Sequence, residues 1–231
     1  MLSGVVTPAD SDEQTGLAPP PGDDTVVLPW WRNPVNLAAI ALVIALVCGA
    51  LGYTLGSHSS AVRGNSVDVG FLQDMRVHHE NAVTIANTYL TTDRADATGA
   101  EGNPTLRLIA NEIAAGQQQE TGRMIQLLRM MGAAEAADLD GQAMVWMNQP
   151  TPYDRMPGIA SDDQIDELGA LDGPAADALF ASLMIAHHEA GIHMAQYALD
   201  HGSNGESKDF AQAMITGQQS EIAEMGRLGF S

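Results

Sequence analysis

The feature that most constrains the fold of this chain is a pattern that occurs twice. Leu183–Leu199, LMIAHHEAGIHMAQYAL, repeats Asp74–Leu90, DMRVHHENAVTIANTYL. In both copies a Met stands three residues before a His-His-Glu triplet, and a helix brings residues three and four apart together on its surface. These residues are Met75, His78 and His79 in the first copy, and Met184, His187 and His188 in the second. The chain therefore places a sulfur and two imidazoles on one side of a helix twice.

The repeat extends beyond these two helices. In the same register Asp68 aligns with Asp177. A shorter shift aligns the residues that follow: Gly116-Gln117-Gln118 with Gly217-Gln218-Gln219, Glu120 with Glu221, and Met124 with Met225. We therefore expect two helical hairpins from one duplicated unit, packed as a four-helix bundle with their apolar stripes inward. The aligned Gln and Glu residues are expected to face the Met-His stripe of their own hairpin.

Hydrophobic periodicity and capping signals place the elements of this all-α fold. Asn103-Pro104 is a helix start, and Gly132 is a C-cap. Pro and Gly residues make 133–160 an irregular crossover, and Ser161-Asp-Asp-Gln164 is a capping box that starts a short helix. The helices are expected over 67–90, 104–131, 161–171, 175–201 and 209–228.

An uncharged apolar stretch precedes the bundle. Val35–Leu55 has 21 residues and no charge, against the ~20 that cross a bilayer core. Trp30, Trp31 and Tyr53 stand near its ends, as interfacial anchors do. A cleaved signal peptide is the alternative, but the long preceding tail and the length of the run favour an uncleaved anchor. We expect a flexible tail over 1–33, a single transmembrane helix over 34–56, a linker over 57–66 and the bundle over 67–231.

The predicted location is the cell membrane, with the N-terminus in the cytoplasm and the C-terminal bundle outside it. The net charge is −19, from 29 acidic and 10 basic residues. Nucleic acid is excluded as a partner, because phosphate binding needs a basic face. An acidic surface suits cations or a basic protein partner. The only cysteine, Cys48, lies in the apolar stretch, so we expect neither an internal disulfide nor a cysteine metal site.

Thioether sulfur combined with imidazole favours Cu(I), and zinc is the weaker alternative. In the second copy Met194 continues the stripe, and Glu189 is placed to orient His193. The candidate metal ligands are Met75, His78, His79, Met184, His187, His188, His193, Met194 and Met225. Two structural interpretations stay open: Met is an ordinary filler of apolar cores, and paired histidines and carboxylates also form polar networks between helices.

The chain lacks the motifs of the enzymes that such a bundle suggests. A di-iron site needs Glu-x-x-His on facing helices, and no Glu here is followed by His three residues later. His-Glu-x-x-His is absent, and no Ser stands in a nucleophile elbow. We therefore expect no enzymatic activity.

These residues resemble a known family. Phe-x-x-x-Met-x-x-His-His followed by Gln-x-x-Glu-Ile-x-x-Met is similar to the pattern of the "domain of unknown function 305" family. The resemblance covers roughly 67–230, including the turn Met156–Ile159 before the second copy. It implies a ferritin-like helical bundle, often extracytoplasmic, with copper binding in some members. The first copy departs from the pattern, because Ile85 replaces the second Met and Thr84 stands at the position of His193.

Two functions follow as hypotheses. The first is a membrane-anchored extracytoplasmic module that binds copper, as Cu(I), for storage, buffering or delivery. The second is a non-catalytic accessory subunit of a membrane protein complex, such as a respiratory oxidase. The apolar stretch and the acidic surface motivate this second hypothesis.

Overall fold

The computed structural model describes residues 29–58, 63–92, 94–136 and 141–230. It separates the chain into two units, Met1–Leu55 and Gly56–Ser231. Residues 1–28 of the predicted tail and 59–62 of the predicted linker lie outside the described residues. The described chain is mostly helical, as predicted.

The first unit contains the predicted apolar stretch as helix α1 (Pro34–His58). Large apolar side chains are exposed along it, including Val35, Leu42 and Leu46. Residues 34–54 have a mean hydropathy of 2.4 over 21 residues, which is long and apolar enough to cross a membrane. A signal sequence near an N-terminus has the same properties. The membrane anchor therefore stays a prediction.

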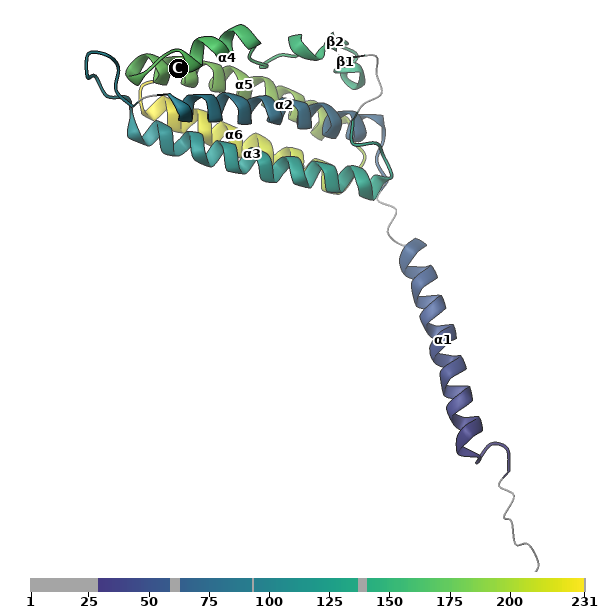
Figure 1. Ribbon diagram of the computed structural model, residues 1–231. Helices are drawn as coiled ribbons and strands as arrows, with labels where there is room; N and C mark the ends of the chain where they lie inside the picture. Colours follow the sequence, from purple (N-terminus) through teal and green to yellow (C-terminus); the bar gives the residue numbers. More distant parts are fainter. Residues whose placement is uncertain (1–28, 59–62, 93, 137–140, 231) are drawn as a thin grey trace, which may run out of the picture. The chain divides into compact units, whose positions relative to one another are not determined.

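The second unit contains two helical hairpins that pack against each other. Helix α2 (Ser66–Thr91) packs on α3 (Pro104–Met131), and α5 (Gly173–His201) packs on α6 (Gly205–Arg227). Helix α2 also lies along α5, and α3 contacts α6, so the hairpins bury each other's apolar stripes (Figure 1). The short helix α4 (Asp162–Gly169) packs on α2 and α5. We call this unit the helical domain.

The ends of these helices follow the predicted capping signals with one exception. Asn103 caps α3, and Gly132 ends it with a left-handed φ of 68°. Ser161 forms the predicted capping box with Gln164. The prediction that the last helix begins at residue 209 was wrong. Helix α6 begins at Gly205, because the Asn204 side chain accepts a hydrogen bond from the backbone of the first turn.

The core of the helical domain consists of two apolar clusters. The first cluster includes Phe71, Met75, Met124, Met194, Phe210 and Met214, and the second includes Ile85, Tyr89, Ile113, Phe180, Met184 and Met225. Along α2 and α5, the two His-His pairs stand between the residues of one cluster and those of the other. The polar residues of the repeat therefore form a layer across an otherwise apolar interior.

Two aligned aspartates form hydrogen bonds that join each hairpin to the loop of the other, and we call each set of these bonds an interhairpin tie. Asp68 on α2 accepts hydrogen bonds from the backbone and hydroxyl of Ser203, at 2.9 and 3.0 Å, in the loop between α5 and α6. Asp177 on α5 accepts one from the backbone of Asn103, before α3, and one of 2.5 Å from the Tyr89 hydroxyl. Both carboxylates are buried. The duplication therefore reproduces one interhairpin tie at each end of the domain.

The crossover between the hairpins is irregular, as predicted, but it contains a short ladder that the sequence did not reveal. Strand β1 (Gln142–Ala143) pairs antiparallel with β2 (Thr151–Pro152). Two 3₁₀ turns, η1 (Val145–Met147) and η2 (Tyr153–Arg155), lie in its described part. These two-residue strands are too short to change the helical class of the fold.

One buried carboxylate holds this crossover to α2. Asp74 accepts hydrogen bonds from the Met144 backbone at 2.6 Å, the Trp146 indole at 2.8 Å and the Tyr153 hydroxyl at 2.9 Å. Burial raises the pKa of Asp74, and the three hydrogen bonds oppose that shift. The first copy alone has this residue, because Leu183 stands at the aligned position of the second.

We expect Asp74→Asn to loosen the crossover while leaving the hairpins folded. The amide keeps one acceptor but turns an NH₂ group toward buried donors, so the free energy of unfolding should fall by about 1–3 kcal/mol. Urea denaturation measures this loss, and hydrogen exchange should show faster exchange at Met144. Glu112→Gln, on the exposed face of α3, is the matched control and should leave both quantities unchanged. Equal protection of Met144 in the variant and the wild type would contradict the assigned role.

Candidate metal centre

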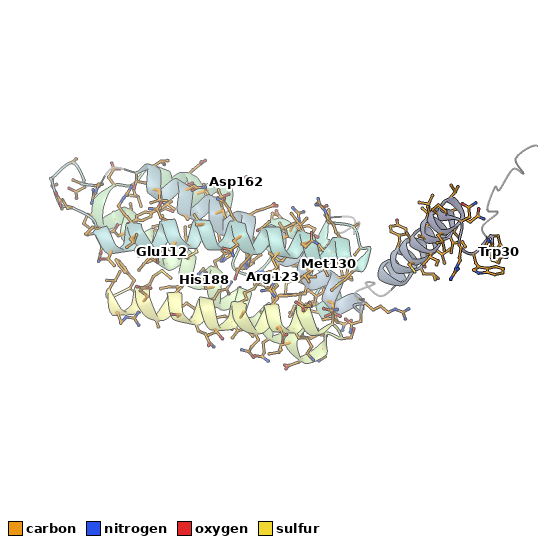
Figure 2. The ribbon with its side chains drawn as sticks, turned by 90° about the horizontal axis from the view of Figure 1, so that it is seen from below. Trp30, Glu112, Arg123, Met130, Asp162 and His188 are labelled. Carbon is orange, nitrogen blue, oxygen red and sulfur yellow. The ribbon has the colours of Figure 1, made fainter. Side chains whose placement is uncertain are left out.

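The polar layer is formed by four histidines, two from α2 and two from α5. His78, His79, His187 and His188 have no exposed surface, and Figure 2 shows His188 in the interior, between the helices. The rings of His78 and His187 lie 3.7 Å apart between centroids, with their planes tilted by 37°. The rings of His187 and His188 are 5.9 Å apart. The duplicated pairs therefore meet at the centre of the domain.

Each hairpin supplies a glutamate to its own histidine. Glu120 on α3 lies 2.7 Å from His79 Nε2, and Glu221 on α6 lies 2.6 Å from His188 Nε2. About a third of each glutamate side chain is exposed, 32% and 33%, so each carboxylate reaches both water and the core. The expectation that the aligned glutamates face the Met-His stripe of their own hairpin is confirmed.

These contacts fix which ring nitrogen carries the proton. A carboxylate or carbonyl only accepts, so His79 and His188 donate through Nε2, and His187 Nε2 donates to the backbone oxygen of His78 at 2.8 Å. The Nδ1 atoms of these three rings are buried without a hydrogen-bond partner, and in a neutral ring that donates through Nε2 the Nδ1 atom carries a lone pair. Neither ring nitrogen of His78 has a partner at full hydrogen-bond geometry, although the backbone of Pro157 lies close enough to oppose the lowering of the pKa of His78. Buried lone pairs without partners are costly, and they are the groups that a metal ion binds.

Burial keeps the central rings neutral. Desolvation, with further contributions from His79 and His188, lowers the pKa of His78 to about 3. Desolvation and the facing ring of His78 lower the pKa of His187 well below its usual value. Neutral imidazole is the form that ligates metals, so these rings need lose no proton when an ion binds.

Glycines let the neighbouring chain approach this layer closely. A Cβ on Gly191 would lie 2.6 Å from Gln218 Oε1, so the amide of α6 packs directly on the α5 backbone one turn after the histidines. Gly158, in the crossover, has a φ of 83°, and a Cβ there would lie 3.0 Å from His78 Nε2. The crossover turn therefore covers the central pair, and a side chain at either glycine would displace a neighbour.

The predicted methionine ligands are all buried, but they are divided between the two core clusters. Met75 and Met194 belong to the first, whereas Met184 and Met225 belong to the second. The helical spacing keeps Met75 one turn from His78 and Met184 one turn from His187. The sulfurs therefore flank the histidine layer on both sides.

The structure does not bring His193 to this layer. It stands five residues after His188, about 140° further around the helix, and its side chain is exposed. His193 therefore lies apart from the four buried histidines, and its role as a candidate ligand stays a prediction. Within the described ranges, moreover, no three His, Cys, Asp or Glu side chains converge as a ready-made metal site. Any metal ion at the centre would have to be bound by imidazole nitrogen together with thioether sulfur.

A small pocket lies between α3 and α6, bordered by the two glutamates that contact His79 and His188. Its volume is about 40 Å³, which holds on the order of one to three water molecules. Its lining residues are Gly116, Gln117, Glu120, Met214, Gly217, Gln218 and Glu221. A larger hollow of about 400 Å³, beside Asp154 and Asp162, is lined by neither His nor Met.

The aligned Gln and Glu residues were expected to face the Met-His stripe but were not among the candidate metal ligands. Their recurrence in both halves was the available signal, because a duplicated unit repeats the residues that its fold or its site requires. Asp74 and Gly158 had no such signal, since each acts on a segment distant in the sequence.

Comparison with known proteins gives one consistent result. The model of the family described as "Domain of unknown function (DUF305)" matches residues 68–228. A solved DUF305 structure from Streptomyces coelicolor is 33% identical, covering 71% of this chain and 91% of its own, with a TM-score of 0.61. A DUF305 fragment from Deinococcus radiodurans is 24% identical, covering 72% and 97%, with a TM-score of 0.58. CopM in its Cu(I)-bound form is 23% identical, covering 70% and 94%, with a TM-score of 0.48. No curated protein matches the chain significantly.

Proposed function

We propose that this chain, which belongs to the DUF305 family, binds Cu(I) at its histidine layer and buffers or delivers copper outside the cytoplasm. The observation that carries the proposal is the set of buried Nδ1 atoms that lack a hydrogen-bond donor. A bound ion would satisfy these lone pairs, while Glu120 and Glu221 orient two of the rings through Nε2. The residues present therefore fit a metal ion.

The ligand types favour copper over harder or more demanding ions. Structural zinc needs four protein ligands and catalytic zinc three, and the described residues offer no such group. Cu(I) accepts linear and trigonal ligand sets and binds thioether sulfur. His187 and His188, with Met184 one turn before them, would hold the ion in the second copy. The first copy offers the equivalent residues but has Ile85 where the second has Met194.

The absence of cysteine from the helical domain agrees with an extracytoplasmic site. Thiolates oxidise to disulfides in oxidising compartments, whereas imidazole and thioether ligands form no disulfides. Helix α1 supplies the means of anchoring the domain at a membrane surface, by its length and composition. Anchoring and extracytoplasmic location are parts of the proposal.

The test is a Cu(I) titration of the full chain in mild detergent, in competition with a chromogenic chelator. We expect tight binding by the wild type, weakened at least about 100-fold by His187→Ala/His188→Ala, since both central ligands of the second copy are lost. His78→Ala/His79→Ala reports on the first copy. His193→Ala is the matched control, because that ring is exposed, and it should bind as the wild type does.

Circular dichroism confirms that each variant is folded before its affinity is compared. Wild-type affinity in both folded double variants would refute the proposed site. No binding by the wild type would refute the proposed function itself and leave the histidines as a structural polar layer.

A second candidate function is a non-catalytic accessory subunit of a membrane protein complex. The apolar side chains exposed on α1 favour it, because a large apolar surface marks a membrane or protein contact. Purification in mild detergent without crosslinker tests it. Elution with a stoichiometric membrane complex supports the subunit, and a monodisperse single protein counts against it. Under this hypothesis a respiratory oxidase is one such complex.

A further inference from the structure

The geometry points to the small pocket between α3 and α6 as the port through which Cu(I) enters and leaves the histidine layer. This inference rests on the proposed copper binding and adds the route. The pocket is bordered by Glu120 and Glu221, the two carboxylates that contact the buried rings of His79 and His188. Each carboxylate is partly exposed to water and also contacts a buried ring. An ion bound to it would therefore be separated from the histidine layer by that one side chain.

Two buried amide side chains line this pocket in addition to its two carboxylates. Gln117 and Gln218 line it and are 3% and 2% exposed. Gln117 Oε1 and both amide atoms of Gln218 have no hydrogen-bond partner. A buried polar atom without a hydrogen-bond partner is costly. In the proposed port, the amide oxygens would replace part of the water that the entering cation loses. Gln218 extends this wall to the α5 backbone at Gly191.

The other faces of the layer are closed by packed groups. The two apolar clusters lie on either side of it along the helices. The Gly158 turn lies against the His78 and His187 pair. An ion with its charge would have to cross apolar side chains or displace that turn, and both are costly for a charged species. The α3–α6 pocket instead offers negative charge and oxygen atoms along the way.

Two helix-interior glycines line the pocket. Gly116 and Gly217 occupy aligned positions on α3 and α6, and a Cβ at either would meet no atom within 4 Å. Glycine in a helix interior is less stable than alanine, and both halves of the duplicated chain nonetheless have it. Neither position therefore places a side chain at the pocket, so a larger residue at either is the direct way to test the port.

The test is to narrow the mouth of the α3–α6 pocket without changing any candidate metal ligand. Gly116→Leu/Gly217→Leu places two side chains over the pocket, and Gly116→Ala/Gly217→Ala places two methyl groups there. Cu(I) is supplied as its complex with a chromogenic chelator, and stopped flow follows both loading of the apo full-length chain and release from the loaded one. We expect loading and release to slow together, at least about tenfold for the Leu variant and less for the Ala variant. The equilibrium affinity should stay within about twofold, because a narrowed port raises one barrier in both directions.

Gly122→Ala/Gly226→Ala is the matched control. These glycines also lie in α3 and α6, are exposed, and have no atom within 4 Å of an added Cβ, but they do not line the pocket. The control should load and release at the wild-type rates, and both Ala double variants should resist urea slightly better than the wild type.

The outcomes separate the port from the proposed function. Wild-type rates in a folded Leu variant that binds Cu(I) would overturn the port alone. Slower loading with unchanged release and weakened affinity would also overturn it, because that result indicates damage to the site. A wild type that binds no Cu(I) in the equilibrium titration would overturn the proposed function and the port with it.

Discussion

The double variant Asp68→Ala/Asp177→Ala is expected to lose on the order of 5 kcal/mol of unfolding free energy. Each alanine leaves buried or part-buried donors unpaired, and the loss of a partner costs a fully buried donor about 1–3 kcal/mol. At Asp68 the donors are the backbone groups of Ser203 and Asn204 and the Ser203 hydroxyl. At Asp177 they are the Asn103 backbone and the Tyr89 hydroxyl. Because a domain of this size is typically stable by 5–15 kcal/mol, the double variant should lose roughly a third or more of its stability.

The two single variants test whether the ties are independent. Asp68 stands at the start of α2 and Asp177 contacts Tyr89 near its end, so the ties are about 30 Å apart along the helix. Losses at such separations add, and urea denaturation should give a double loss equal to the sum of the single losses. Asp→Asn at each position keeps one acceptor and should lose less. A double variant as stable as the wild type would show that the ties contribute nothing.

Acid is expected to destabilise the copper-free protein well before ordinary acid denaturation. Burial holds the pKa of His78 at about 3 in the folded chain, against about 6.5 when unfolded. Below pH 6.5 the unfolded chain therefore binds protons that the folded chain does not, and stability falls as the pH drops from 6.5 toward 3. The full shift corresponds to a loss on the order of 5 kcal/mol for His78, and His187, whose pKa is also lowered, adds to it.

Asp74 acts in the opposite direction in acid. Its pKa is raised in the folded chain, so the folded state takes up that proton first and gains stability as the pH falls through this range. We expect the two histidines to dominate between pH 6.5 and 5, above the ordinary range of carboxyl groups. Urea denaturation at several pH values, with a copper chelator present, measures the slope.

Two variants test whether the buried histidine rings cause this dependence of the unfolding free energy on pH. His78→Leu removes one titrating group and should flatten the dependence on pH, whatever it does to the stability at neutral pH. His193→Gln removes an exposed ring and should leave the slope unchanged. Stability that is constant from pH 7.5 to 5 in the wild type would contradict the picture of neutral buried histidines.

The helices and the layout of the candidate site were largely predictable because they depend on local spacing and on the duplication. The Met and the two His of each copy share a helix face at a separation of one turn, and the structure buries them as expected. Capping residues at Asn103, Gly132 and Ser161 gave helix ends within a residue or two. The start of α6 was missed because the polar residues around Asn204 conceal which of them is the cap.

Contacts between segments distant in the sequence were decided only by the tertiary structure. The sequence by itself determined two duplicated hairpins with a Met-His stripe and aligned Gln and Glu residues. It did not determine that His187 donates to the His78 backbone, that Gly158 covers this pair, or that His193 faces solvent. The physical reason is that helical periodicity fixes a side chain only relative to its own helix. The rotation of each helix and the path of the crossover follow from packing and from buried hydrogen bonds such as those of Asp68, Asp74 and Asp177.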